Sequence, residues 1–450
     1  MSCCRKPNLI KNKYISNLIS IIAIYLGISF YFSLNDLFQL IKYSFSIEDK
    51  NKYYEMLFSI FSSLAQSIGM LIGGILEYKI NYFYTTLTGL LISLISIIII
   101  FFAYKSSVFY IFGVIWGLGV GISVSLLRKN LILFSPNKKG LTLSFVRIIN
   151  TIFYAVVLYV INVYIIYSLG SFLFYSFIGI IIGLILFGLF SWEYKKEDEI
   201  NVNEEMSNQI SESNQNNDNH LNEKEALDKL NSLEEELDRD DIKSYVINIM
   251  KTWRFWRIVI ISILLNFPLS LISSSSLYLA NNFNFLTQSA LKFILIFPLV
   301  VLLLSPLIGY FSDKKSHLLI LIIISGINII PFFLLIFFIK NEIIFCITFA
   351  INELSINGLY ISFLSYIMEI YGIQESAIIN GIIDIFPTIS LITRAIIIYK
   401  IGINYKNEVE DYFNQIKKLY IPGPICCTVA LVLLIFERKI KLLGEQKNFN

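Results

Sequence analysis

Long runs of apolar residues, separated by short polar segments, occupy most of the chain. Each run can form a helix that crosses the hydrocarbon core of a bilayer, which needs about 20 residues. The runs are too long for the strands of a membrane barrel and lack their alternation. We therefore predict an all-α membrane protein with twelve transmembrane helices. The runs fall at about 15–38, 55–76, 82–103, 108–127, 141–165, 168–192, 254–280, 287–311, 316–338, 341–367, 376–399 and 418–437.

The predicted spans form two groups of six, which indicates two six-helix bundles joined by an acidic linker. In the linker, residues 193–243 hold 17 Asp and Glu but 6 Lys and Arg, and an Asn- and Ser-rich middle is typical of disorder. Leucines at helical spacing predict an amphipathic helix over 221–238, either solvated or packed under the membrane domain. The expected domains are 1–14 (N-terminus), 15–192 (first bundle), 193–251 (linker), 252–437 (second bundle) and 438–450 (tail).

Lysines and arginines are unevenly distributed among the short loops. Bases precede the first span and follow spans two, four, six, eight and twelve, and positively charged loops stay on the cytoplasmic side. We therefore predict that both termini and the linker are cytoplasmic. The loops at 39–54 and 400–417 also carry lysines, which weakens the asymmetry without reversing it. The bases are Arg5, Lys6, Lys11, Lys13, Lys79, Arg128, Lys129, Lys138, Lys139, Lys195, Lys196, Lys314, Lys315, Arg438, Lys439 and Lys441.

Composition narrows the class of protein. Apolar residues make up 56% of the chain and charged residues 15%, against roughly 45–50% and about 25% in soluble domains. A soluble fold cannot cover so much apolar surface, which excludes a soluble enzyme, a nucleic-acid-binding protein and a disordered scaffold. The expected environment is the lipid bilayer of the plasma membrane or of an internal organelle.

Residue types for metal binding or covalent catalysis are scarce. The five cysteines lack metal-ligand spacing, and the two histidines, His220 and His317, exclude a histidine proton relay. No set of nucleophile and base is visible. We therefore expect no enzyme, no cofactor and no metal site. Cys3 and Cys4 lie beside two bases and are read either as free thiols or as palmitoylation sites.

A short pattern recurs at matching places in the two halves, with an acidic residue four positions after a glycine and a cation behind it. The copies are Gly73, Glu77 and Lys79 after span two, and Gly309, Asp313 and Lys314 after span eight. Glycine lets helices approach closely, and the carboxylate can cap a neighbouring helix or pair with a base. We predict contacts that form and break as the halves rock against each other.

The two copies resemble the loop signature of the major facilitator superfamily, in which a glycine precedes an aspartate and a base. This resemblance covers nearly the whole chain outside the linker and the termini. It implies a secondary transporter whose two bundles expose a midplane site to each side in turn. Since one chain supplies both bundles, it also implies a monomeric functional unit.

A narrower resemblance lies between spans four and five. Gly117, Gly119 and Gly121 precede a turn with Pro136 and Gly140, a pattern similar to the branch of monocarboxylate transporters and oxalate/formate antiporters. It implies a small organic anion as substrate. The three glycines lie inside an apolar helix with no strand before it, so they are not a dinucleotide loop, and we expect them to serve helix packing.

The sequence departs from that branch in two ways. Ser305 stands where the branch often has an arginine, and Asn35 and Asp36 replace its acidic–Gly–Trp element. The heavy use of Ile, Asn, Lys and Tyr resembles a protist with an A/T-rich genome, of apicomplexan type. This setting keeps an amino-acid transporter of the same superfamily as an alternative.

Polar groups within the spans are candidates for the substrate site, because a charge at the centre of a span costs about 2.5–3.5 kcal/mol. Arg147 lies roughly 10 Å into its span and either binds an anionic substrate, snorkels or ties helices together. Arg394, nearer the other face, is a substrate cation, a gate residue or an anchor. Asn150 and Asn352 offer hydrogen bonds to a substrate or to neighbouring helices.

Two carboxylates fall near the midplane. Glu353 and Asp384 lie roughly 14–16 Å deep in a core of about 30 Å. Removal from water favours the protonated form of a carboxyl group. Both residues are therefore candidates for proton coupling, with a structural hydrogen bond as the alternative role.

Together these patterns predict a secondary active transporter that moves a monocarboxylate or similar organic anion by alternating access, with or without protons as the coupling ion. One alternative is an amino-acid transporter, in which a midplane carboxylate would face the ammonium group of the substrate. The other is a non-transporting receptor or scaffold that acts through the linker.

Overall fold

The structure is a computed structural model, and the part of the chain that it describes consists of helices and short turns. The chain divides into two compact units, one formed by residues 1–192 with 258–450 and one by residues 193–257. The amphipathic helix expected over 221–238 lies outside the described residues. The description covers residues 13–32, 53–102, 106–160, 169–191, 241–282, 302–338, 341–373, 375–401, 414, 417–418 and 420–448.

A described helix lies in each of the six spans predicted for the first half. Their apolar sequences must satisfy backbone hydrogen bonds internally in lipid, which a helix does. The short 3₁₀ helix η1 (Pro136–Lys138) joins the fourth and fifth of these helices. They are α1 (Lys13–Phe32), α3 (Tyr53–Ile80), α4 (Tyr82–Phe102), α5 (Ser106–Leu133), α6 (Lys139–Val160) and α7 (Leu169–Phe190).

The second half also has described helices in each predicted span, and two of its spans are broken into pairs. α13 and α14 meet at Asn328, and α16 and α17 meet at Phe386 before Pro387. The second unit contributes α10 (Asp241–Met250) before this half. The helices are α11 (Trp253–Asn282), helix 302–314, α13 (His317–Ile327), α14 (Ile329–Phe338), α15 (Glu342–Tyr371), α16 (Ser376–Ile385), α17 (Pro387–Ile401) and α19 (Pro422–Asn448).

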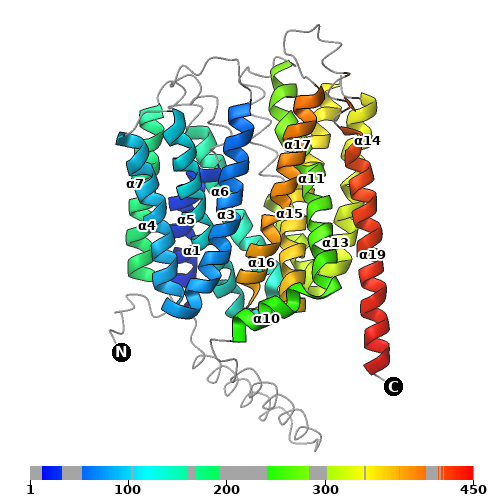
Figure 1. The fold of residues 1–450 in the computed structure, drawn as a ribbon, viewed down its shortest axis with the longest axis horizontal. Helices are drawn as coiled ribbons and strands as arrows, with labels where there is room; N and C mark the ends of the chain where they lie inside the picture. The colour runs from blue at the N-terminus through cyan, green and yellow to red at the C-terminus, as the bar shows by residue number, and fades with distance from the viewer. Residues whose placement is uncertain are drawn as a thin grey trace, which may run out of the picture. The chain divides into compact units, whose positions relative to one another are not determined.

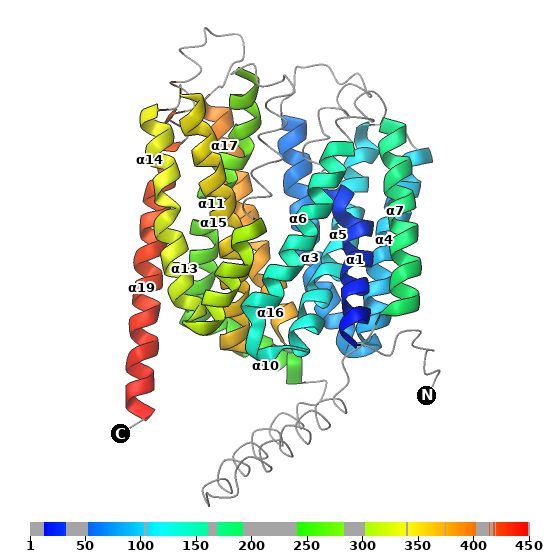
Figure 2. The same ribbon diagram turned by 180° about the vertical axis from the view of Figure 1, so that it is seen from behind.

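The two groups of helices stand side by side. Figures 1 and 2 show α1 to α7 on one side and α13, α14, α15 and α19 on the other, with α16 next to α3 at the lower end. In both views α1 begins and α19 ends at this lower end. This arrangement agrees with an even number of crossings, while the cytoplasmic side of the termini stays a prediction.

Eight helices of the described part are long and apolar enough to cross a membrane, or nine if α10 and α11 count as one broken span. The apolar part of α1, Ile15–Ile28, is shorter. The predicted total of twelve spans is thus supported in part and otherwise stays a prediction.

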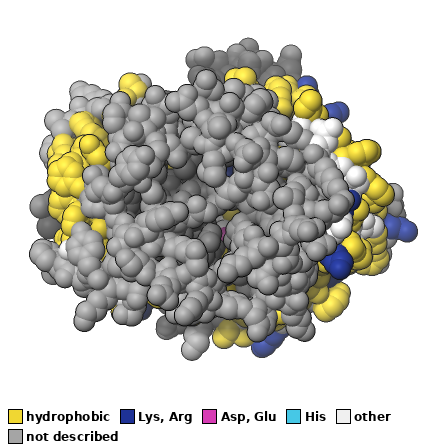
Figure 3. Space-filling view, turned by 90° about the horizontal axis from the view of Figure 1, so that it is seen from above, with side chains coloured by type: hydrophobic (Ala, Val, Ile, Leu, Met, Phe, Trp, Pro, Cys, Tyr) yellow, Lys and Arg dark blue, Asp and Glu magenta, His cyan; other side chains and the backbone are white. Residues whose placement is uncertain are grey.

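Apolar side chains cover the outside of the helices. Ile111, Phe145, Leu303 and Phe337 are each more than half exposed. Figure 3 shows hydrophobic side chains along the described flanks of the first unit. Such exposure would drive association in water, and the hydrocarbon of a bilayer removes that penalty.

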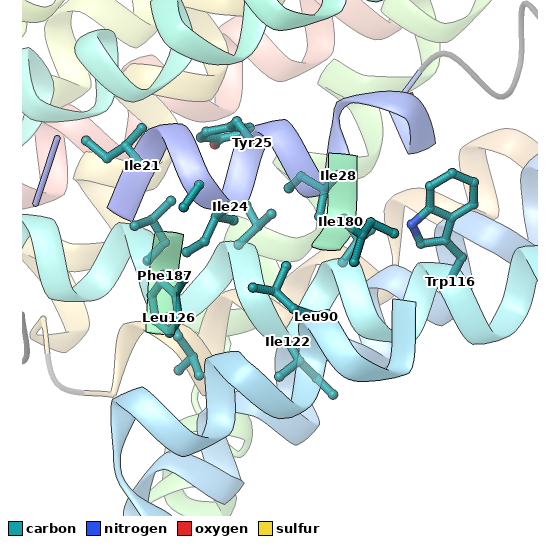
Figure 4. Close-up of a cluster of buried hydrophobic side chains, with 14 of the residues drawn as sticks. Ile21, Ile24, Tyr25, Ile28, Leu90, Trp116, Ile122, Leu126, Ile180 and Phe187 are labelled. Carbon is teal, nitrogen blue, oxygen red and sulfur yellow. The ribbon is translucent and has the colours of Figure 1, made fainter. Parts of the chain in front are cut away.

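The core of the first bundle lies between α1, α4, α5 and α7. Ile24, Leu90 and Phe187 are fully buried there, and Figure 4 shows them meeting beneath α1. Tyr25 lies on the other side of the α1 ribbon from Leu90 in this view. The isoleucines of α1 thus anchor the helix in its own bundle while its tyrosine points elsewhere.

Glycines bring α3, α4 and α5 into close contact. A Cβ atom on Gly119 would lie 2.5 Å from the carbonyl oxygen of Gly89, and one on Gly121 would overlap the carbonyl oxygen of Gln66. Real side chains do not reach such distances, so these positions require glycine. The prediction that the glycines of span four serve helix packing is confirmed for Gly119 and Gly121.

The turn between α3 and α4 depends on Asn81. This residue has a φ of 92°, a region that asparagine tolerates better than most residues. Its side-chain Oδ1 accepts a hydrogen bond from the backbone N–H of Tyr84 at 3.2 Å, which caps α4. The chain can therefore reverse within one residue after the first copy of the glycine–acid pattern.

We expect Gly121→Ala to lower the free energy of unfolding by about 1–3 kcal/mol, because the added methyl group meets the backbone of α3 and cannot be accommodated without a shift. Gly188→Ala on α7 is the matched control, since its Cβ would meet nothing within 4 Å. The control should be neutral or stabilising by up to ~1 kcal/mol. Thermal unfolding in detergent measures both, and equal melting temperatures would contradict the packing argument.

Candidate functional site

The two bundles touch closely where α6 begins. A Cβ atom on Gly309 of helix 302–314 would lie 2.5 Å from the carbonyl oxygen of Gly140, and one on Gly140 would lie 2.7 Å from that of Gly309. The two backbones therefore meet without side chains between them. This contact joins the halves of the chain at the end where α1 begins.

Asp313 completes this contact as a cap of α6. Its Oδ1 accepts a hydrogen bond from the backbone N–H of Gly140 at 2.7 Å, and its Oδ2 accepts one from Leu141 at 2.9 Å. These N–H groups have no partner within their own helix, and the helix dipole favours a negative charge there. Asp313 thus caps a helix of the other bundle, while Lys314 is exposed and lies against Tyr310.

The first copy of the pattern places its carboxylate differently. The Nζ of Lys129 on α5 donates to Oε2 of Glu77 on α3 at 2.9 Å, and the two side chains are only 4% and 14% exposed. Lys79, the cation expected from the sequence, is exposed at the end of α3. This copy therefore forms a buried ion pair within the first bundle.

The glycines around the first copy form a second contact between the bundles. A Cβ atom on Gly74 would lie 2.7 Å from Cγ1 of Ile378 on α16, and one on Gly381 would lie 2.6 Å from the backbone nitrogen of Leu71. Gly73 faces α5 instead, with Ile122 Cα at 3.0 Å from its would-be Cβ. α3 and α16 thus pack as closely as helix 302–314 and α6.

A cavity of about 160 Å³ lies between helices of both bundles. Its lining is partly apolar, and the polar lining residues come from α5, α11, α15 and α16. The residues that line it are Arg128, Ser262, Leu265, Asn266, Leu269, Ile356, Leu359, Tyr360, Phe363, Leu364, Asn380 and Asp384.

Arg128 is the cation of this cavity. It is 9% exposed, and its guanidinium carbon lies 4.5 Å from the centre of the Tyr360 ring. Its Nε has no hydrogen-bond partner among the described residues. Asp384 on the opposite bundle interacts electrostatically with it, so the cavity holds one basic and one acidic group.

Asp384 is held by its own helix and by α3. One of its carboxylate oxygens accepts a hydrogen bond from the side-chain amide of Asn380 at 3.1 Å. Its backbone carbonyl accepts one from the Ser67 hydroxyl at 2.9 Å. Asn380 therefore orients the carboxylate, and Ser67 of the first bundle binds the backbone of the same residue.

A second arginine contacts the same tyrosine ring. Arg147 on α6 lies 5.3 Å from the centre of the Tyr360 ring and donates from Nε to the side-chain oxygen of Asn357. Tyr25 of α1 is within hydrogen-bonding reach of Arg128 and Tyr360. Both arginines belong to the first bundle, whereas the Tyr360 ring and the Asn357 amide belong to α15 of the second bundle.

The structure brings together some of the residues singled out from the sequence. Asp384 lines the cavity, and Arg147 is joined to it through Tyr360. Asn150 is buried on α6, where its Oδ1 has no partner among the described residues. Asn352 is buried and Glu353 half-buried on α15, and neither lines the cavity.

The backbone of Arg394 is part of α17, and the structure does not describe the position of its side chain. Within the described part of the chain, no group of three His, Cys, Asp or Glu side chains could hold a metal ion.

Sequence reasoning missed Arg128 as a site residue. The sequence pattern predicts a loop base after span four, whereas α5 continues to Leu133 and buries Arg128. A signal was present, because Leu126 and Leu127 precede the charged pair and Leu131 to Leu133 follow it. Apolar residues on both sides of a charge indicate that the helix continues through it.

Comparisons with known proteins agree with this architecture. The profile of the Major Facilitator Superfamily matches residues 17–392, which is more than half of the chain. No curated protein matches the sequence.

Solved transporters share the fold at low sequence identity. The human organic anion transporter MFSD10 (TETRAN) is similar with a TM-score of 0.63 and 10% identity, over 96% of this chain and 100% of that one. The proton:xylose symporter XylE, bound to 6-bromo-6-deoxy-D-glucose, has a TM-score of 0.62 and 14% identity, over 94% of each chain. The transporter FucP, in the outward conformation, has a TM-score of 0.62 and 13% identity, over 94% and 99%.

We expect Lys129→Met to lower the free energy of unfolding by about 3–5 kcal/mol, because it leaves the Glu77 carboxylate buried beside an apolar side chain. The double variant Glu77→Gln, Lys129→Met should recover most of this loss. Lys79→Met, at the exposed lysine, is the control. Melting temperatures of these variants in detergent are compared as a double-mutant cycle. A Lys129→Met protein as stable as the control would argue against the buried pair.

We expect Asp313→Ala to loosen the contact between the bundles, since loss of a helix cap costs about 0.5–2 kcal/mol. A cysteine at Ser144, which packs against Gly309, reports this loosening in a chain whose five native cysteines are replaced by serine. Its labelling by a maleimide should be several-fold faster with Asp313→Ala. Lys315→Ala, which removes an exposed charge two residues away, should leave the rate unchanged.

Proposed function

Because the chain belongs to the Major Facilitator Superfamily, a family of multi-pass membrane transporters, we propose that it is a secondary active transporter of a small organic anion. The observation that carries this proposal is the charge of the cavity and its surroundings. Arg128 and Arg147 supply two cations and Asp384 supplies one anion around Tyr360. A bound carboxylate would balance the remaining positive charge.

Arg128 is the residue that we assign to the carboxylate of the substrate. Its Nε has no partner among the described residues, and a buried guanidinium binds carboxylates through charge-assisted hydrogen bonds. Asn266 and Asn380 line the same cavity and offer further amide groups. Leu265, Leu269 and Phe363 are apolar lining residues of the cavity and would suit the hydrocarbon part of a small organic acid.

Asp384 is our candidate for proton coupling. It is the carboxylate that lines the cavity, so its protonation would change the charge that the substrate meets. Glu353 stands two turns from Tyr360 on α15, and we keep it as a second candidate for a proton site. Arg147 would act on the substrate through Tyr360 or directly once Asn357 moves away.

An amino acid is the second candidate substrate. The reason is that Arg128 and Asp384 line one cavity, and a zwitterion presents a carboxylate and an ammonium group to such a pair. Asp384 would then bind the ammonium group instead of carrying a proton.

Alternating access in this chain would use the two close contacts at the end where α6 begins. Gly140 with Gly309, and Gly74 with Ile378, bring the backbones of the bundles together there. We infer that Asp313 holds this end closed and releases α6 when it opens. The functional unit is proposed to be one chain in the plasma membrane or in an organelle membrane, with both termini cytoplasmic.

The structural neighbours differ from one another in the solutes that their names give. One is an organic anion transporter and another is a proton:xylose symporter. Their identities of 10% and 14% establish the shared fold alone. The choice of an anion for this chain therefore rests on its own arginines.

Radiolabelled uptake into proteoliposomes tests the proposal. The solutes are lactate, pyruvate, oxalate, and neutral and cationic amino acids, each with and without an inward proton gradient. We expect saturable uptake of a carboxylate that Arg128→Gln reduces by roughly ten- to a hundred-fold, since a hydrogen bond to a charged group contributes about 1.5–3 kcal/mol. Arg438→Gln, an exposed position on α19, is the control and should transport normally.

Asp384→Asn separates the two candidate substrates. For a proton-coupled anion, the variant should lose the stimulation by the proton gradient and keep uptake without it. For an amino acid, the variant should lose uptake under both conditions. Folded wild-type protein that transports none of these solutes would overturn the proposed substrate class.

A further inference from the structure

Tyr360 contacts Arg128 and Arg147, the two arginines that the proposed function assigns to substrate binding. Its ring centre lies 4.5 Å from the guanidinium carbon of Arg128 and 5.3 Å from that of Arg147. An arginine within about 6 Å of a ring face is attracted by its quadrupole. One ring of the second bundle therefore contacts two cations of the first.

Asn357 adds a hydrogen bond between the same two helices. Its side-chain oxygen accepts from Nε of Arg147, and its side-chain nitrogen donates to the carbonyl of Glu353 at 2.7 Å. The amide is thus oriented by its own helix with its oxygen toward α6. Tyr360 and Asn357 lie three residues apart on α15, so both reach the first bundle from neighbouring positions on one side of the helix.

These contacts cannot survive the opening of this end of the transporter. Arg147 lies only two turns after the start of α6, where Gly140 meets Gly309 and where Asp313 caps the helix. Separation of α6 from the second bundle at that end carries Arg147 away from Tyr360 and Asn357. Arg128 would leave not only Tyr360 but also Asp384, because both belong to the second bundle.

Opening an empty transporter would therefore take from buried Arg128 and half-buried Arg147 their contacts with the second bundle, and leave Arg128 with Tyr25 of its own bundle. An unpaired charge in a low-dielectric interior is strongly disfavoured. A carboxylate bound to the arginines would keep them paired throughout the movement. The loaded transporter should for this reason open more readily than the empty one.

We propose that Tyr360 and Asn357 form a latch on Arg128 and Arg147, and that this latch makes the protein an exchanger. The latch is defined by the inter-bundle contacts of these four side chains. An anionic substrate takes over the arginines from the ring and the amide, so the bundles part when a solute is bound and stay together when none is. This proposal rests on the proposed function for its substrate, but the latch itself can be tested without any solute.

The first experiment measures opening of the empty protein. Spin labels on Asn137→Cys and Lys315→Cys, which lie in exposed positions on either bundle at this end, are placed in the full chain after replacement of its native cysteines. Distances are measured by double electron–electron resonance in liposomes without added solute. We expect the closed distance to dominate, and Tyr360→Leu to raise the ratio of open to closed protein by at least about five-fold, within the range usual for such couplings.

Matched variants separate the latch from general damage. Tyr360→Phe keeps the ring and should retain most of the closed population. Tyr310→Leu removes another tyrosine that contacts a cation, Lys314, but within one helix of one bundle, and should behave as the wild type. Should Tyr360→Leu fail to give monodisperse protein, Asn357→Ala tests the same latch through Arg147. Variants with the wild-type distance distribution overturn the proposal.

The second experiment measures exchange with a solute that the uptake panel has identified, for example pyruvate. Wild-type proteoliposomes preloaded with unlabelled solute should take up label several-fold faster than empty ones. Tyr360→Leu should bring this ratio towards one by making the empty protein mobile. If preloading does not change the rate of uptake by the wild-type protein, the proposal that the protein is an exchanger is overturned.

The two experiments distinguish failure of the proposed substrate from failure of the proposed latch. If no anion is transported while Tyr360→Leu still opens the empty protein, the proposed substrate is wrong and the latch stands. If an anion is transported and Tyr360→Leu changes neither the distances nor the preloading ratio, the substrate stands and the latch is wrong.

Discussion

A charge inside a helical membrane protein needs a partner, and this need organises the contacts between the helices of the chain. Lys129 and Glu77 satisfy it permanently, as a buried pair within one bundle. Arg128 and Arg147 satisfy it across the two bundles, through the face of an aromatic ring, an amide oxygen and, for Arg128, the more distant charge of Asp384. The ring and the amide are weaker partners than a carboxylate, and we propose that an anionic solute replaces them.

The two copies of the glycine–acid pattern show how one sequence feature serves two structural ends. In the second copy the carboxylate caps a helix of the other bundle. In the first copy the carboxylate binds a lysine of its own bundle. The contact between α3 and α16 is made by glycines and by Ile378. One side of the closed end is therefore held by polar bonds and the other by close packing.

The helices could be predicted from the sequence because runs of about 20 apolar residues have few alternatives in a membrane. The breaks at Asn328 and Phe386 divide two spans without moving their ends. The site was predicted less completely. Arg147 and Asp384 stood out as charges within apolar runs, whereas Arg128 was assigned to a loop because α5 was expected to end before it. The partner of Glu77 lies 52 residues away, and no local pattern indicates such a pair.

The ion pair of Lys129, the neighbour of Arg128 on α5, helps to explain the direction in which the Arg128 side chain points. Successive residues of a helix point about 100° apart, so Lys129 and Arg128 leave α5 in different directions. The ion pair of Lys129 with Glu77 fixes the rotation of α5 against α3, and the close approach of Gly121 to Gln66 fixes its distance. With both set, the preceding side chain of the helix, Arg128, lines the cavity. The buried pair within the first bundle thus positions the cation that meets the second.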